Sequence, residues 1–293
     1  MGGHGWGRTE ERELVGAINA ALESGVSFFD TADVYGLGRS ESLLGAVLKE
    51  HRPRVVLATK FGVRMENGRT FHDNSPAWIR SALEGSLKRL KTDYVDLYQI
   101  HYRDGRTPIS EVVETLNRLK EKGLIRYSGL SNIYKSDCGE LRDYPGCFVS
   151  FQNEYSLARR TYEDDITWLA EELNMTPMTW GSLGQGILTG KYDRKTNFGA
   201  DDRRSRSVYR NFYGSALTKN LAIAQVIQDI ADDQRKPPAA VALRFILDRW
   251  PQSVVLAGAK RPDQVTGQAE AAGWRLTDEQ FQRLERVSKC QDA

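Results

Sequence analysis

Four residues that can hold or move protons follow segments that read as buried strands. Asp30 ends the apolar run at 26–29, and Tyr35 follows it in a stretch with glycines at 36 and 38. Lys60 ends the run at 54–60, and His101 ends the run at 93–101. A carboxylate can hold an ammonium group, an ammonium lowers the pKa of a phenol, and a neutral imidazole can hydrogen-bond a carbonyl. Such a set suits the protonation of an oxygen on which negative charge develops.

Each of these residues alone has a simpler interpretation. An aspartate after a strand is typical of a turn, and a single tyrosine, lysine or histidine is more often structural. Four complementary types at successive strand ends favour a functional site. A hydride needed to complete the reaction must come from a cofactor, because no side chain supplies one.

The elements around these residues alternate between short apolar strands and amphipathic helices. We expect strands near residues 28, 57, 97, 127, 150, 178 and 255, with helices between them. This alternation predicts one α/β domain over residues 1–293, a (β/α)8 TIM barrel. No G-x-G-x-x-G follows the first strand, which disfavours a dinucleotide-binding sheet. The chain opens on a helix, so the first barrel strand is missing or atypical, and we expect either an upstream start or unusual closure.

Composition excludes several classes of protein. The chain has 293 residues and a formal net charge of +2, which does not favour nucleic acid. No apolar run approaches the ~20 residues that span a bilayer, and the first residues lack the apolar segment of a secretion signal. The three cysteines and four histidines lack metal-ligand spacing, which predicts a reduced, cytoplasmic protein without a metal site.

Five stretches in this order resemble the aldo-keto reductases: FFDTADVYG, ATKFG, DLYQIH, GLSN at 129–132 and LGQGILTGKY at 183–192. The resemblance implies NAD(P)H-dependent reduction of an aldehyde or ketone, a small-molecule carbonyl substrate. It implies that Tyr35 is the general acid, that Lys60 lowers its pKa, that Asp30 pairs with Lys60, and that His101 orients the carbonyl. Tyr102 and Arg103 replace a Trp-Pro pair that is frequent in the family, so we expect a reshaped substrate pocket.

The resemblance also implies where the cofactor binds. It assigns the nicotinamide carboxamide to Ser131, Asn132 and Gln152, and the stacked aromatic ring to Trp180. Lys260 and Arg261 bring two positive charges that suit a 2′-phosphate, so we expect NADP (NADPH), with NAD less favoured. The other implied contacts are Gly181, Ser182, Leu183, Gly184, Gln185, Lys191, Gly258, Lys260, Gln264 and Gln268.

Two other functions stay open at this point. A nucleotide-binding regulatory or scaffold subunit with little turnover would share the fold, but the intact set of four proton-handling residues argues against it. A barrel glycosidase could use Asp30 and Glu154 as paired carboxylates, but Lys60 beside Asp30 argues against that chemistry. The substrate's identity and the oligomeric state are not predicted.

Overall fold

The structure is a computed structural model that describes all residues except 1–4, 8, 67 and 290–293. The described chain divides into two compact units. Unit 1 holds residues 25–153 and 165–177, and unit 2 holds the described residues up to 24 together with 154–164 and 178–289. The expectation of one domain over residues 1–293 stays a prediction.

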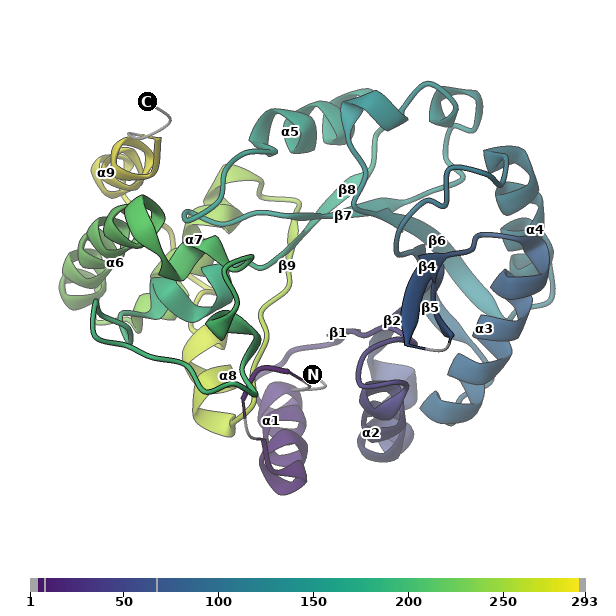
Figure 1. Ribbon diagram of the computed structural model, residues 1–293, viewed down its shortest axis with the longest axis horizontal. Coiled ribbons are helices and arrows are strands. Elements are labelled where there is room, and N and C mark those ends of the chain that lie inside the picture. Colours follow the sequence, from purple (N-terminus) through teal and green to yellow (C-terminus); the bar gives the residue numbers. More distant parts are fainter. Residues whose placement is uncertain (1–4, 8, 67, 290–293) are drawn as a thin grey trace. The chain divides into compact units, whose positions relative to one another are not determined.

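Unit 1 is built on parallel strands joined by helices (Figure 1). Their order in the sheet is β1 (Phe28–Asp30), β2 (Val56–Phe61), β5 (Val95–Ile100), β6 (Ile125–Ser131) and β7 (Ser150–Glu154). The connecting helices are α2 (Arg39–Leu48), η1 (Lys49–Arg54), α3 (Pro76–Leu90), α4 (Ile109–Glu121), η2 (Lys135–Asp137), η3 (Leu141–Asp143) and α5 (Glu163–Glu172). All six residues of β5 are buried, as expected for a parallel strand covered on both faces.

A hairpin that the sequence analysis did not predict follows β2. Its strands, β3 (Val63–Glu66) and β4 (Arg69–His72), pair in an antiparallel manner. The backbone N–H of Asp73 donates to the carbonyl of Gly62 at 3.1 Å, and Arg64 pairs with Asp73 at 2.8 Å. The hairpin therefore stands at the carboxyl end of β2, the end at which barrel enzymes carry their chemistry.

Unit 2 contains the end of β8 (Thr176–Trp180) in parallel register with β9 (Val254–Val255). Its helices are α1 (Glu11–Glu23), η4 (Gly184–Thr189), η5 (Arg203–Ser205), η6 (Arg210–Phe212), α6 (Gly214–Gln234), α7 (Pro238–Arg249), α8 (Pro262–Ala269) and α9 (Asp278–Lys289). α1 packs along α8 (Figure 1). Gly16 permits this approach, because a Cβ there would lie 3.1 Å from the ring of Pro262.

The predicted fold class is confirmed. Each of the seven strands expected from the sequence is present among the described residues, and every pairing recorded in the main sheet is parallel. Ahead of α1, the described residues 5–7, 9 and 10 form no strand, and Trp6 makes an isolated antiparallel bridge with Asp202. The expectation of an upstream start or unusual closure stays a prediction.

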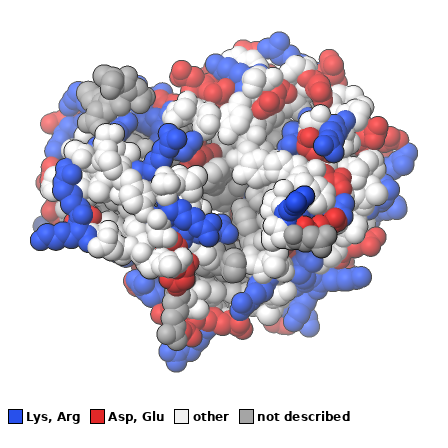
Figure 2. All heavy atoms as spheres, viewed as in Figure 1, with Lys and Arg blue, Asp and Glu red and all other residues white. Residues whose placement is uncertain are grey.

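Three further properties bear on partners and ligands. On the face that Figure 2 shows, Lys and Arg side chains are interspersed with Asp and Glu side chains. Among the helices described, none is long and apolar enough to cross a membrane. No cluster of three or more His, Cys, Asp or Glu residues suited to a metal ion occurs in the described part of the chain.

Candidate active site

The four proton-handling residues converge because the strands that carry them are neighbours. Asp30 ends β1 and pairs in register with Ala58 of β2, and Lys60 of β2 pairs with Gln99 of β5. His101 directly follows β5, and its N–H donates to the carbonyl of Phe61 at 2.8 Å. Parallel strands bring their carboxyl ends to one edge, so these side chains meet there.

A buried ion pair lies at the centre of the site. Lys60 Nζ lies 2.5 Å from Asp30 Oδ2 and donates to the carbonyl of Thr31 at 2.9 Å. The Lys60 side chain is fully buried. Burial lowers the pKa of Lys60, but the charge of Asp30 and the contact with Tyr35 outweigh burial, and the net pKa is raised. Lys60 is therefore a fixed cation at neutral pH.

The Tyr35 ring is held between that cation and an imidazole. Lys60 Nζ lies 5.2 Å from the ring centroid and hydrogen-bonds the Tyr35 side chain. The His101 ring meets the Tyr35 ring edge-on, with centroids 5.6 Å apart. Burial raises the pKa of Tyr35, and although Lys60 acts to lower it, the net pKa lies above 10.0. Burial therefore outweighs the effect of Lys60 on the pKa of Tyr35.

His101 is a neutral imidazole in this setting. Burial, with smaller contributions from Lys60 and His72, lowers its pKa from 6.5 to about 3. Its Nδ1 atom is buried and has no hydrogen-bond partner among the described residues. A neutral ring next to Tyr35 can hydrogen-bond a carbonyl oxygen without adding a second positive charge beside Lys60.

Two of the residues expected at the nicotinamide hydrogen-bond Asp30 and the backbone of His101. Gln152 Nε2 donates to Asp30 Oδ1 at 2.9 Å, while Asn132 Nδ2 donates to the carbonyl of His101 at 3.0 Å. Ser131 Oγ donates to the carbonyl of Gln152 at 3.0 Å. Gln99, which sequence reasoning missed, also donates to Asp30 Oδ1 at 3.1 Å. The one feature of the sequence that could have indicated a role for Gln99 is that it is a polar residue within an apolar strand.

A second acidic site, also missed, lies beside Tyr35 in the chain. Asp33 is largely buried, and burial together with the charge of Glu41 raises its pKa from 3.8 to about 7. Glu41 is fully buried and accepts hydrogen bonds from Thr59 at 2.5 Å and from Arg89 at 2.7 Å. Asp33 Oδ1 has no partner among the described residues. Because Asp33 also acts to raise the pKa of Tyr35, its charge state affects the site.

The other predicted cofactor residues lie in unit 2, in two segments next to β8 and β9. The first begins at Trp180 and includes Gly181, Ser182, Leu183 and Gly184. Ser182 Oγ donates to the carbonyl of Leu256 at 3.2 Å, which joins this segment to the chain after β9. Gly184, Gln185 and Gly186 have φ values of 56°, 56° and 100°, so three successive residues adopt a left-handed backbone.

Gln185 in that loop hydrogen-bonds residues outside the loop through its side chain and its carbonyl. It accepts from Asn211 Nδ2 and donates to Glu154 at 3.4 Å, and its carbonyl accepts from Arg204 at 3.3 Å. Lys191, further along, is exposed. The loop is therefore anchored by side chains that precede and follow it in the sequence.

The segment after β9 is organised around Lys260. Its backbone N–H donates to Gln264 Oε1 at 2.8 Å, and its Nζ donates to the carbonyl of Trp6. Gln268 donates to the carbonyl of Gly258 at 3.0 Å, so the four predicted residues after β9 come together locally. Burial is the main cause that lowers the pKa of Lys260; the charge of Arg204 acts in the same direction and that of Asp202 opposes it.

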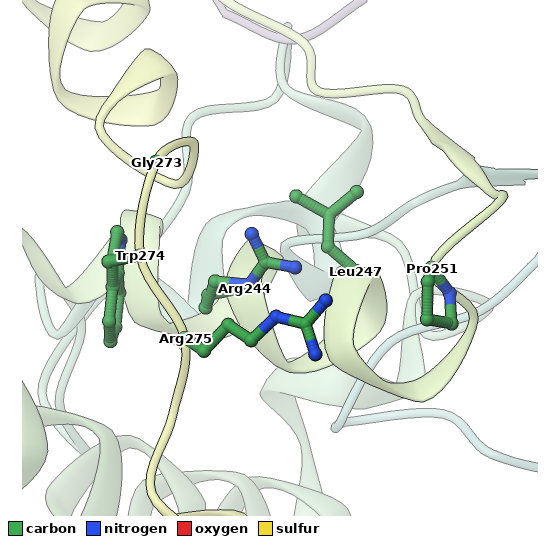
Figure 3. Close-up of a pocket in the computed structure, with 6 residues that line it drawn as sticks. All are labelled: Arg244, Leu247, Pro251, Gly273, Trp274 and Arg275. Carbon is green, nitrogen blue, oxygen red and sulfur yellow. The ribbon is translucent and has the colours of Figure 1, made fainter.

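A separate hollow in unit 2 contains none of the predicted residues. The side chains of Arg244 and Arg275 both lie between α7 and the 273–275 segment, and Trp274 lies on the other side of that segment (Figure 3). Arg244 is already paired with Asp248 at 3.1 Å and donates to the carbonyl of Ala271 at 3.2 Å. No proton-transfer group lines this hollow, so we assign it no chemistry.

The strands and connecting helices define a β/α barrel. The sequence model of the Aldo/keto reductase family matches residues 1–289, and the chain belongs to that family. The chain is 34% identical over 282 residues to the aldo-keto reductase YhdN of Bacillus subtilis, covering 95% of this chain and 84% of that protein. It is 32% identical over 288 residues to "Aldo-keto reductase yakc [NADP(+)]" of Schizosaccharomyces pombe, covering 95% and 83%.

A solved structure agrees with these sequence matches. The glycerol dehydrogenase AKR11B4 from Gluconobacter oxydans superposes with a TM-score of 0.87 at 37% identity, covering 98% of this chain and 88% of that one. The family resemblance seen in the sequence is thereby confirmed, and the chain's class is that of an oxidoreductase.

Proposed function

We propose that this protein reduces an aldehyde or ketone to an alcohol with NADPH as hydride donor and Tyr35 as general acid. One observation carries the proposal: Lys60 is held by Asp30 at 2.5 Å and contacts Tyr35, whose ring meets that of His101. These are the groups needed to bind a carbonyl oxygen and deliver a proton to it.

The charge state of each residue determines its role in the proposed reaction. Neutral His101 hydrogen-bonds the carbonyl oxygen and orients it toward the Tyr35 hydroxyl. Tyr35 keeps its proton in the resting state, because its pKa lies above 10.0. It releases the proton as negative charge develops on the substrate oxygen, and the Lys60 ammonium stabilises the phenolate that forms. Asp30 holds Lys60 in place throughout.

NADPH, when bound, would supply the hydride for the carbonyl carbon, and several residues of this chain would suit it. Ser131, Asn132 and Gln152 offer amide and hydroxyl groups beside the catalytic residues, suited to a carboxamide. Gly184 and Gly186, both with a left-handed backbone, lack a Cβ and so permit close approach of a phosphate group to this loop. Lys260 would supply a positive charge for a 2′-phosphate. The NADP(+) in the name of the fission-yeast relative supports the same choice.

The substrate class that we propose is a small, polar aldehyde or ketone. The support is the 37% identity and 98% coverage with a structure described as a glycerol dehydrogenase. Glyceraldehyde and dihydroxyacetone are therefore the first carbonyls to test, beside a simple aromatic aldehyde and a simple ketone.

The test follows the oxidation of NADPH and of NADH with that panel. We expect turnover with at least one carbonyl and a higher kcat/KM with NADPH than with NADH. Tight NADPH binding without turnover of any carbonyl would instead support the regulatory-subunit alternative. Hydrolysis of aryl glycosides without cofactor would support the glycosidase.

A further inference from the structure

A continuous stack of rings connects the catalytic histidine to the unexpected hairpin. The His101 ring stacks on Tyr102, with centroids 5.1 Å apart and planes inclined by 16°. The opposite end of the stack is His72, whose ring lies 4.9 Å from that of Tyr102 with an interplanar angle of 5°. His72 is the last residue of β4, so the hairpin supplies one end of the stack.

The stack matters because His101 has little else to fix its ring. The orientation of a functional imidazole is ordinarily set by a hydrogen bond to its second nitrogen. Nδ1 of His101 is buried without such a partner among the described residues. Ring packing remains as the constraint, with the edge-on contact to Tyr35 and the stacked contact to Tyr102.

The hairpin is tied to the loop that carries Tyr102. Asn74, fully buried just after β4, donates from Nδ2 to the carbonyl of Tyr102 at 3.1 Å. Its backbone N–H donates to Asp104 Oδ2 at 2.8 Å, and its Oδ1 accepts from the N–H of Asp104 at 2.8 Å. The backbone passes so close that a Cβ on Gly62 would lie 2.7 Å from Asn74 Nδ2. These bonds hold the end of β4 beside the loop after β5.

We propose that His72 is a positioning residue that clamps Tyr102 against His101 and so holds the catalytic imidazole in the orientation that binds the carbonyl. The inference rests on the proposed function, and it assigns the hairpin a role in positioning a catalytic residue. It requires a flat ring at position 72 and no hydrogen bond from that ring. His72 touches neither substrate nor cofactor in this scheme, and it acts through Tyr102.

The test compares His72→Ala, which removes the ring, with His72→Phe, which keeps one. His51→Ala is the matched control, because His51 precedes β2 and lies at the opposite, amino end of that strand. We expect His72→Ala to lower kcat about 10-fold through misorientation of His101, with NADPH affinity unchanged within about 2-fold. His72→Phe should restore kcat to within about 2-fold of the original protein. Equal loss in both variants, or loss in neither, would overturn the clamp.

A spectroscopic measurement separates this inference from the proposed function. Long-range ¹H–¹⁵N spectra of the imidazoles report the tautomer and ring environment of His101 without any substrate. We expect one neutral tautomer in the original protein and in His72→Phe, and a mixed or broadened signal in His72→Ala. If no carbonyl is reduced, the proposed function fails but this comparison still decides the clamp. An unchanged His101 signal in folded His72→Ala would refute it.

Discussion

The Lys60 ammonium lies 2.5 Å from the Asp30 carboxylate, with the lysine side chain fully buried and the aspartate side chain 12% exposed. Removing one partner of such a pair leaves a buried charge uncompensated. We expect Asp30→Asn to lower the free energy of unfolding at pH 7 by about 3 kcal/mol in urea titrations. Asp229→Asn is the control, because its pair with Arg283 is exposed and should cost below about 1 kcal/mol.

The sign of the pH dependence follows from Lys60. Its pKa in the folded protein lies above the ordinary 10.5, so its stabilising contribution is complete below pH 10.5 and is lost as the pH rises through the folded value. Lys60 should therefore add no pH dependence to the free energy of unfolding of the original protein from pH 6 to 9. In Asp30→Asn burial lowers the pKa of Lys60 without the opposing charge of Asp30, so the stability difference between the two proteins should shrink as the pH rises, and a difference that grew with pH would contradict the assignment of a charged Lys60.

Asp33 should give the activity an inflection near pH 7. Its pKa is raised to about 7, and its anion acts to raise the pKa of Tyr35, which makes the phenol a weaker acid. We expect kcat/KM to fall by about 3- to 10-fold as Asp33 ionises, and Asp33→Asn to remove that inflection. The measurement is a pH profile of both proteins between pH 5.5 and 8.5. An inflection that persisted in Asp33→Asn would assign it to another group.

The same carboxyl group predicts a change in stability. The pKa of Asp33 is higher in the folded protein than in the unfolded chain. Its contribution to the free energy of unfolding is therefore complete below pH 3.8 and is lost as the pH rises through about 7. Asp33→Asn should therefore be more stable than the original protein at pH 8, by about 1–2 kcal/mol after allowance for partial exposure. Urea titrations at pH 5.5 and pH 8 would measure it, and a variant less stable at both values would contradict the prediction.

Lys260 should determine the choice between the two nicotinamide cofactors. Its Nζ donates to the carbonyl of Trp6, and Arg261 is paired with Asp263 at 3.0 Å, so Lys260 is the cation that we expect to meet a 2′-phosphate. We expect Lys260→Ala to weaken NADPH binding about 10-fold and to leave NADH binding unchanged. Fluorescence titrations with both cofactors measure this, and equal loss for both would contradict a role at the 2′-phosphate.

The sequence alone predicted the strands and the four proton-handling residues because both are local signals. Apolar runs that end on Asp30, Lys60 and His101 need no tertiary information. The hairpin strands at 63–66 and 69–72 were not predicted because they are mostly exposed and contain no continuous apolar run, although the dipeptide Asn67-Gly68 is a hairpin signal. Packing decides the rest: Asp33 has a pKa of about 7 only because the fold buries it near Glu41.

The net pKa of Tyr35 is another property that could not be predicted from the sequence. Sequence reasoning identified the lysine that acts on the phenol, but it could not weigh that charge against burial, which the fold alone determines. The stack of His72, Tyr102 and His101 also depends on a hairpin whose place is fixed by Asn74 and not by local pattern.

The most direct test of the account is Tyr35→Phe, which removes one hydroxyl and keeps the ring. We expect kcat for carbonyl reduction to fall by about 10³-fold, while NADPH binding, followed by tryptophan fluorescence, stays within about 2-fold of the original protein. Carbonyl reduction at an undiminished rate in Tyr35→Phe would contradict the claim that this phenol delivers the proton.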